Sequence, residues 1–210
     1  MPDVLHFDKD LALEKATMVL RKKGYNSATI KDLTRVTGLS ESSLYNTFGS
    51  KEELFKSALD RYATGIMSHL APLKRPGSAL QALRECWLAM CADAAGENRG
   101  QGCMVTNSVV ELAPHNAVIR KKLKAIYQEF EDLFDETLKR AQAQGELDSR
   151  RDTRALARYL LHSTQGIRVL SKLSPSIDYL NEIAEVTLSV LDQGGVATKE
   201  RVKKTTEAKR

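Results

Sequence analysis

Residues 40–46, SESSLYN, carry a run of short or planar side chains that can form hydrogen bonds. At 100° per residue around a helix, Ser42 and Asn46 lie nearly opposite Leu44 and are flanked by Ser43 and Tyr45. Such a face suits the base edges exposed in the major groove of DNA. The alternative is an ordinary solvent-exposed helix face in an all-helical protein.

A second candidate group is the thiol of Cys103, which follows the segment RGQG and opens an expected helix. The positive end of the helix and the guanidinium of Arg99 would both stabilise a thiolate there. Such a thiol is open to alkylation or oxidation. Free cysteine is more often a small buried apolar residue, and that interpretation stays open.

Aromatic and thioether side chains of the second half predict a mostly apolar cavity with one polar corner, although such a stripe also suits a plain core. The expected lining is Trp87, Met90, Met104, Tyr127, Phe130, Phe134 and His162. We interpret Cys86 and Cys91 as core or cavity lining, because their spacing does not make them a pair. Glu111 either faces that cavity or is a solvated charge, and we expect the solvated charge.

No pattern of an enzyme emerges. The four histidines are scattered, and no His, Cys, Asp or Glu cluster has the spacing of metal ligands. We therefore expect no catalytic residue, no metal and no cofactor.

The polar face at 40–46 needs helices to position it, and the flanking sequence supplies them. Gly38 allows a sharp turn between two short helices, and Ser40 can cap the second one. The apolar positions of the two helices would pack together; they are Ile30, Leu33 and Val36, then Leu44, Thr47 and Phe48.

Flanking helices complete this unit. A first helix is expected from about Asp8 to Lys23, ending at Gly24, with a core stripe of Leu11, Ala12, Ala16, Val19 and Leu20. Residues 27–29 would begin the second helix, whose free N–H groups can hold a phosphate. Ser50 to Glu53 reads as a capping box that starts a fourth helix.

This arrangement, with GLS at the turn and then SSLYNTFGSKEELF, resembles the N-terminal domain of TetR-family transcriptional regulators over residues 8–60. The resemblance implies that Tyr45 and Lys51 contact phosphates and that Thr29 both caps and contacts a phosphate. It makes Ser42, Ser43 and Asn46 candidates to reach bases, with Ser40 beside them. Thr34 stands where the family often has alanine, and its hydroxyl can bond back to a helix carbonyl.

The rest of the chain reads as long helices without strands, so we expect an all-α fold. The expected helices cover about 78–95, 103–113, 116–143, 152–172 and 177–192. The expected domains are a helix-turn-helix DNA-binding domain at 1–55, a ligand-sensing and dimerisation domain at 56–195, and a basic tail at 196–210.

The last two expected helices have surplus apolar surface and small residues, which favours pairing with a second copy in a four-helix bundle. The expected interface is Leu156, Leu160, Ser163, Ile167, Leu170, Leu180, Ala184, Leu188 and Leu191. The alternative is that both faces are covered within one chain. The family resemblance favours the homodimer, which would read a palindromic operator.

Charge is spread unevenly. Residues 1–70 hold 10 Lys and Arg against 9 Asp and Glu, residues 71–195 hold 16 against 16, and the tail holds 6 against 2. DNA binding would therefore depend on placed donors and not on a large basic patch. No apolar run is long enough to span a membrane, and the N-terminus does not resemble a signal peptide, so we expect a cytoplasmic protein.

The segment GCMVTN at 102–107 resembles the same helix start in a branch of the family that includes electrophile- and oxidant-responsive repressors. These resemblances imply a homodimeric DNA-binding repressor that releases DNA in response to a small molecule, an electrophile or an oxidant. The alternative function is a helical protein-protein adaptor without DNA binding.

Overall fold

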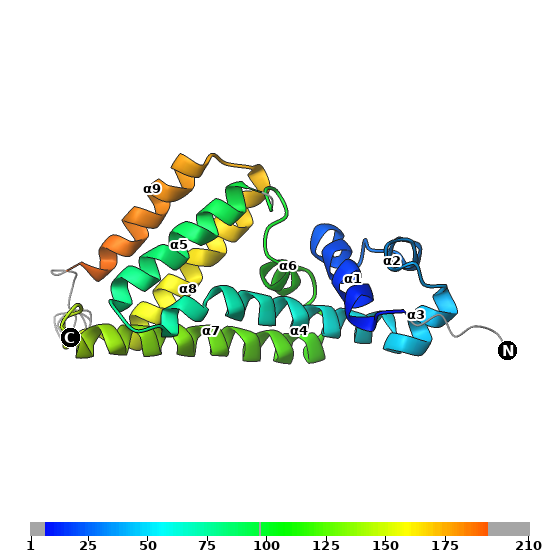
Figure 1. Ribbon diagram of the computed structural model, residues 1–210, viewed down its shortest axis with the longest axis horizontal. Coiled ribbons are helices and arrows are strands. Elements are labelled where there is room, and N and C mark those ends of the chain that lie inside the picture. The colour runs from blue at the N-terminus through cyan, green and yellow to red at the C-terminus, as the bar shows by residue number, and fades with distance from the viewer. Residues whose placement is uncertain (1–6, 97, 193–210) are drawn as a thin grey trace, which may run out of the picture.

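The computed structural model describes residues 7–96 and 98–192, in which every regular element is a helix (Figure 1). The α-helices are α1 (Lys9–Lys23), α2 (Ile30–Thr37), α3 (Glu41–Phe48), α4 (Lys51–His69), α5 (Ala79–Ala95), α6 (Met104–Glu111), α7 (Ala117–Ala143), α8 (Thr153–Leu170) and α9 (Ile177–Leu188). Short 3₁₀ turns follow at η1 (Ala71–Lys74), η2 (Ser171–Leu173) and η3 (Ser189–Leu191). The all-α prediction is confirmed, whereas the basic tail lies outside the described residues.

Most helices begin at a residue whose side chain caps the first turn, and some of them end at a glycine. Side-chain oxygens cap the first turns of eight helices, at Asp8, Thr29, Ser40, Ser50, Ser78, Asn116, Asp152 and Ser176. Glycines in the positive-φ region then end α1 and α2, with Gly24 at φ 80° and Gly38 at φ 74°. For α1 and α5 to α9, the predicted bounds agree with the structure to within a few residues.

Two local details differ from the prediction. Ser50 accepts a hydrogen bond from the amide of Glu53, but the Glu53 carboxylate binds Lys56, so only half of the expected capping box forms. Leu11 is 47% exposed and is not part of the α1 core, where Ala16 and Leu20 are buried. The narrow α1 stripe contacts α2 and α4, and Leu11 lies outside it.

The helices form two connected groups (Figure 1). Helices α1 to α3 gather at one end, and α5, α8 and α9 pack together at the other. Helices α4 and α7 run along one side, and α6 lies between the groups, where it contacts α1, α4, α7 and α8. The expected domain boundary at residues 55 and 56 falls inside α4, which continues across it without a break.

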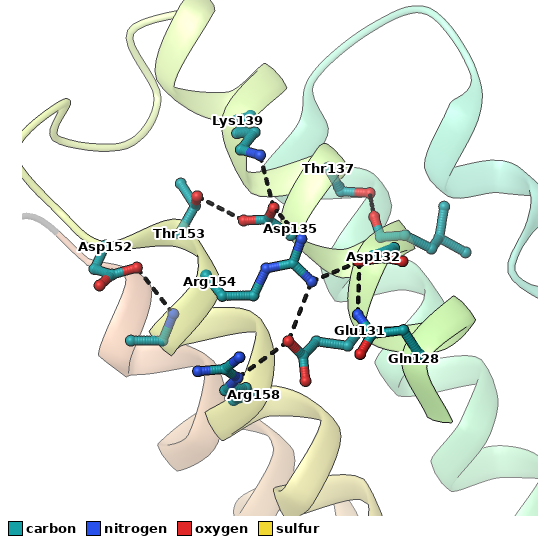
Figure 2. Close-up of polar contacts among 12 residues, drawn as sticks. Gln128, Glu131, Asp132, Asp135, Thr137, Lys139, Asp152, Thr153, Arg154 and Arg158 are labelled. Atoms are coloured by element: carbon teal, nitrogen blue, oxygen red, sulfur yellow. Dashed lines mark hydrogen bonds and ion pairs between the residues drawn. The ribbon is translucent and has the colours of Figure 1, made fainter. Parts of the chain in front are cut away.

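An ion-pair network joins α7 to α8 (Figure 2). Asp135 is 1% exposed and accepts from Thr153 at 2.6 Å, from Lys139 at 2.7 Å and from Arg154 at 2.9 Å. Arg154 also contacts Asp132 at 2.6 Å. Because every oxygen of this buried carboxylate has a partner, the network fixes the start of α8 against the middle of α7.

The expected dimer seam needs correction. Most of its members are buried inside the protomer, with exposures of 8% or less: Leu156, Leu160, Ile167, Leu180, Ala184, Leu188 and Leu191. They pack α8 and α9 against the chain's own core, so they are not available to a second copy. Of the expected seam, Leu170 (40% exposed) and the half-buried Ser163 face outward.

Candidate functional site

Helix α3 presents a polar face beside the packed α1–α2–α4 unit. Leu44 is 2% exposed and Phe48 is 8% exposed, so one side of α3 is anchored in the core. Ser42, Tyr45 and Asn46 are exposed on the other side. The sequence prediction of this orientation is confirmed, and it exposes three hydrogen-bonding side chains on the outer side of α3.

The serine hydroxyls of this face are already engaged with one another. Ser40 Oγ accepts from the amide of Ser43 at 3.1 Å and donates to Ser43 Oγ at 2.9 Å. Ser42 Oγ lies 3.0 Å from Ser40 Oγ. Ser40 therefore holds the first turn of α3, and any base contact by Ser42 or Ser43 must share or replace these bonds.

The start of α2 is held by a reciprocal capping box that the sequence analysis missed. Thr29 Oγ1 accepts from the amide of Asp32 at 3.1 Å, and the Asp32 carboxylate accepts from the Thr29 amide at 3.0 Å. The Thr29 hydroxyl also donates to Asp32, at 2.8 Å. The spacing T-x-x-D is the available signal, since aspartate can take the place of glutamate in the box.

The same carboxylate joins α1 to α2. Hydrogen bonds from Lys23, at 2.8 Å, and then from Thr29 hold the pKa of Asp32 well below its usual range. Arg35 contacts it at 3.0 Å. Asp32 thus stays ionised and fixes the angle at which α2 presents its N-terminal amides. The expected Thr29 phosphate contact must come from those amides or from a hydroxyl that has left Asp32.

Tyr45 on α3 and Lys51 on α4 lie on neighbouring helices, with Tyr45 exposed and Lys51 half-buried. Tyr45 is 38% exposed. The Lys51 ammonium lies 4.6 Å above the ring of Tyr25, whose edge packs against Phe55 with ring centroids 5.0 Å apart. This stacking orients a cation at the start of α4, where the helix dipole disfavours it unless an anion is close.

A cavity of about 400 Å³ lies where α1 and α4 meet α5 to α8. It brings together most of the side chains predicted for it: Trp87, Met90, Cys103, Tyr127, Phe130 and Phe134, with Cys86. Helix α1 contributes Thr17, Met18 and Arg21, and α4 contributes Tyr62 and Ile66. The sequence analysis missed these residues, since only folding brings the N-terminal helices to the cavity wall.

Two predicted lining residues lie elsewhere. Met104 is 1% exposed and belongs to the core, and it does not line the cavity. His162 is exposed on α8, with Nδ1 2.6 Å from the carbonyl of Arg158. Both residues are on the right helices, but their side chains point in other directions.

The polar corner of the cavity is centred on Gln165. Its Oε1 accepts from Thr106 at 2.7 Å and from Tyr127 at 2.8 Å, and its Nε2 donates to Thr164 at 2.8 Å. Burial raises the pKa of Tyr127 to about 12. Gln165 was not predicted, because a lone glutamine in a helix gives no signal.

Cys103 is the N-cap residue of α6 and is 6% exposed on the cavity wall. Burial, and then the neighbouring Cys103, raise the pKa of Tyr62 above its usual range. Burial raises the pKa of Cys86 and of Cys91 as well. The guanidinium near Cys103 is that of Arg21, which donates to the Gly102 carbonyl at 3.1 Å, whereas Arg99 donates to Ser174.

Glu111 is the last residue of α6. Its carboxylate is not a solvated charge, as was expected, but forms hydrogen bonds within the protein. Its carboxylate accepts from the backbone amides of Tyr25 at 3.0 Å and Asn26 at 2.7 Å, in the turn between α1 and α2. One end of α6 thus meets the cavity and the other end holds the turn that precedes α2.

Among the described residues, no three His, Cys, Asp or Glu side chains form a group that could hold a metal ion. In the same ranges, no helix is both long and apolar enough to cross a membrane.

A capped α2, a glycine turn and an anchored α3 with an outward polar face define a helix-turn-helix DNA-binding protein. Family models agree: residues 12–58 match bacterial regulatory proteins of the tetR family, and residues 76–186 match the tetracyclin repressor-like C-terminal domain. The chain belongs to the TetR family of transcriptional regulators.

Individual relatives span nearly the whole chain. An uncharacterized HTH-type transcriptional regulator of Bacillus subtilis, YezE, is 34% identical over 89% of this chain and 97% of its own length. The Escherichia coli repressor ComR is 30% identical over 87% and 88%. A solved structure of the TetR-family regulator CifR, a cysteine mutant complexed with 26-bp double-strand operator DNA, superposes with a TM-score of 0.81 at 28% identity, covering 89% of this chain and 97% of that one.

Proposed function

We propose that this protein is a homodimeric repressor that binds a palindromic operator and releases it when a small molecule or an electrophile or oxidant acts at the cavity. The DNA-binding domain would be residues 1–55, and the sensing and dimerisation domain residues 56–195. The observation that carries the proposal is that α1 of the DNA-binding unit lines the same cavity as Cys103. A change in that cavity therefore acts directly on the helix that braces α2 and α3.

For DNA contacts, we assign Tyr45, Lys51 and the α2 N-terminus to phosphates, and Ser42, Ser43 and Asn46 to bases. This division follows their exposure and the general rule that phosphate contacts position a protein while base contacts give specificity. The similarity to CifR, whose structure was solved in complex with 26-bp operator DNA, supports double-strand DNA as the partner.

For dimerisation, we propose the outward faces of α8 and α9 in place of the buried seam. Exposed apolar residues lie along α8, the η2 turn and α9: Tyr159, Val169, Leu170, Leu173, Tyr179 and Val186. Ser163 and Gly166 lie between them on α8 and allow close approach. Two copies joined there would carry two α3 helices to half-sites about 34–36 Å apart.

Operator binding is tested by gel shift with the DNA upstream of the protein's own gene. We expect a palindromic fragment to shift, and Lys51→Gln to weaken binding and lower the slope of log affinity against log salt by about 1. Asn46→Ala should instead relax the sequence preference. If no palindromic fragment shifts even at low salt, the repressor function fails, and a protein-protein adaptor becomes the better interpretation.

The thiol response is tested with N-ethylmaleimide. The Cys103 sulfur would add to one alkene carbon of the maleimide while the other carbon takes a proton, so nothing leaves and the adduct fills the cavity. We expect operator affinity to fall at least tenfold in the wild type and in Cys86→Ser, and to persist in Cys103→Ser. Equal loss in all three proteins would rule out Cys103 as the sensor.

A further inference from the structure

The cavity lining combines apolar and charged side chains, and the charged ones bear on the kind of molecule that it takes. Trp87, Met90, Phe130 and Phe134 give it an apolar, aromatic surface. A charged cluster of Arg21, Asp93, Asn98 and Arg168, joined by hydrogen bonds, also lines it. The inference below rests on the proposed function, because it names the effector class of that same cavity.

Charged side chains of the lining are mostly paired. Arg61 contacts Glu14 at 2.6 Å, and Arg168 contacts Asp93 at 3.1 Å. Asn98 also donates to Asp93 through its side-chain amide. These two ion pairs are locally neutral, so neither would by itself attract a charged ligand.

Arg21 is different, because its guanidinium forms no ion pair within residues 7–96 and 98–192. Its Nη1 donates to Asn98 Oδ1 at 2.6 Å and its Nη2 to the Gly102 carbonyl at 3.1 Å. Its Nε is buried and has no hydrogen-bond partner in this part of the chain. Its carbon Cζ lies 5.4 Å from the ring centroid of Tyr62. Within the described residues, the hydrogen-bond partners of this half-buried cation are neutral, and the nearby Asp93 carboxylate is already paired with Arg168.

Buried or half-buried charges in proteins are normally neutralised by a counter-ion. Among the described residues the two ion pairs cancel, so the charged cluster keeps the positive charge of Arg21, next to an apolar space of ligand size. We propose that the cavity binds an apolar small molecule with an anionic head, such as a medium-chain or aromatic carboxylate. The head lies at Arg21 and Arg168, and the body lies against Trp87 and the phenylalanines.

The position of Arg21 also connects binding to DNA release. Arg21 is on α1, and its bonds to Asn98 and Gly102 tie α1 to the loop before α6. When the carboxylate of a ligand accepts hydrogen bonds from the Arg21 guanidinium, the bonds from Arg21 to Asn98 and Gly102 are lost. Because α1 packs against α2 and α4, the DNA-binding helices then lose one of their fixed contacts to the sensing domain.

Trp87 makes a direct assay possible, because it is the only tryptophan of the chain and lines the cavity. Its fluorescence is titrated at pH 7.5 with two matched pairs, octanoate with octanamide and 4-phenylbutyrate with its amide, below self-association. We expect the acid of at least one pair to bind tenfold or more tightly than its amide. Arg21→Gln should abolish that preference by reducing acid binding to the level of the amide, whereas Arg84→Gln, at an ion-paired arginine of α5 outside the cavity lining, should retain it.

Equal binding of acid and amide, no saturable signal with either pair, or an undiminished preference in Arg21→Gln would overturn the proposal. Circular dichroism melting of Arg21→Gln shows whether the variant is folded. Anisotropy of labelled operator DNA separates the two proposals: DNA binding without acid preference defeats only the ligand class, and acid preference without DNA binding defeats only the repressor function.

Discussion

The carboxylate of Glu111, at the C-terminal end of α6, accepts a hydrogen bond of 2.7 Å from the backbone amide of Asn26, in the turn that leads into α2. Its other oxygen accepts from the amide of Tyr25 at 3.0 Å. These residues are 85 and 86 positions apart in sequence, so the contact is made only by the packing of α6 on α1. It directly connects a helix of the cavity wall to the turn that leads into α2.

Glu111→Gln is expected to weaken this connection. Two amide donors need two acceptors, and glutamine offers one acceptor and one N–H group that opposes the remaining donor. Hydrogen bonds to charged groups contribute about 1.5–3 kcal/mol, so the free energy of unfolding should fall by about that amount in urea denaturation. Release of operator DNA by N-ethylmaleimide should also weaken.

The matched control for this change is Glu129→Gln, an exposed glutamate of α7. It should change neither the unfolding midpoint nor the response. If Glu111→Gln behaves as Glu129→Gln does, Glu111 has no part in stability or in coupling.

Gly24→Ala is expected to be much more damaging than Gly38→Ala. Gly24 has φ 80° and ψ 175°, a region that is essentially restricted to glycine, and an added Cβ would lie 2.7 Å from Glu111 Oε2. Gly38 is in the left-handed helical region and has open space around the same position. We expect a cost of about 1 kcal/mol at Gly38, as for a single strained backbone position, and clearly more at Gly24.

Combining Gly24→Ala with Glu111→Ala tests the cause of that difference. Removing the carboxylate removes the collision but not the backbone strain, so the double variant should be more stable than the sum of the single effects predicts. Simple additivity in thermal melts would show that the collision contributes nothing.

Asp135→Asn is expected to reduce stability strongly at neutral pH and weakly in acid. Burial by itself raises the pKa of Asp135, but hydrogen bonds from Lys139 and Thr153 and the charge of Arg154 outweigh it, so the pKa lies below its usual value. A carboxyl whose pKa is lowered by folding stabilises the protein above its unfolded pKa, about 3.9, and loses that effect as the pH falls through the folded pKa.

At pH 6 the free energy of unfolding of the wild type should therefore exceed that of Asp135→Asn by about 3 kcal/mol, the usual cost of breaking a buried ion pair. This difference in free energy of unfolding should become smaller below about pH 4. Urea denaturation at pH 6, 4 and 3 measures this gap. Glu136→Gln, the exposed neighbour, serves as the reference. A gap that stays constant with pH would mean that the carboxylate charge is not what stabilises α7 against α8.

Val186→Asp is expected to separate the proposed dimer without unfolding the protomer. Val186 is 73% exposed on α9, so the change costs little within one chain, but it would bury a charge between two copies. Light scattering should give a mass near 23.3 kDa in place of twice that value, with a large loss of operator affinity. Val110→Asp, 72% exposed on α6, should remain dimeric. If the Val186→Asp variant is still a dimer, α9 is not part of the dimer interface.

The local order of this protein could be read from its sequence. Cap residues such as Ser40 and Asn116 and the turn glycine Gly38 stand where their own chemistry ends or begins a helix, so the bounds of the helices were predictable. The polar face of α3 was predictable for the same reason, because the direction of a side chain on a short helix depends on its spacing from Leu44.

Tertiary packing decided the relationships between helices. Leu160 and Leu180 have the same apolar pattern whether they face the chain's own core or a second copy, and only the folded chain buries them internally. His162 and Met104 lie on cavity helices but point away from the cavity. Arg21 and Glu111 carried no local signal at all, because their partners lie about 80 residues away along the chain. Spacing along one helix determines which residues share a face, whereas the neighbour of that face depends on how the helices pack.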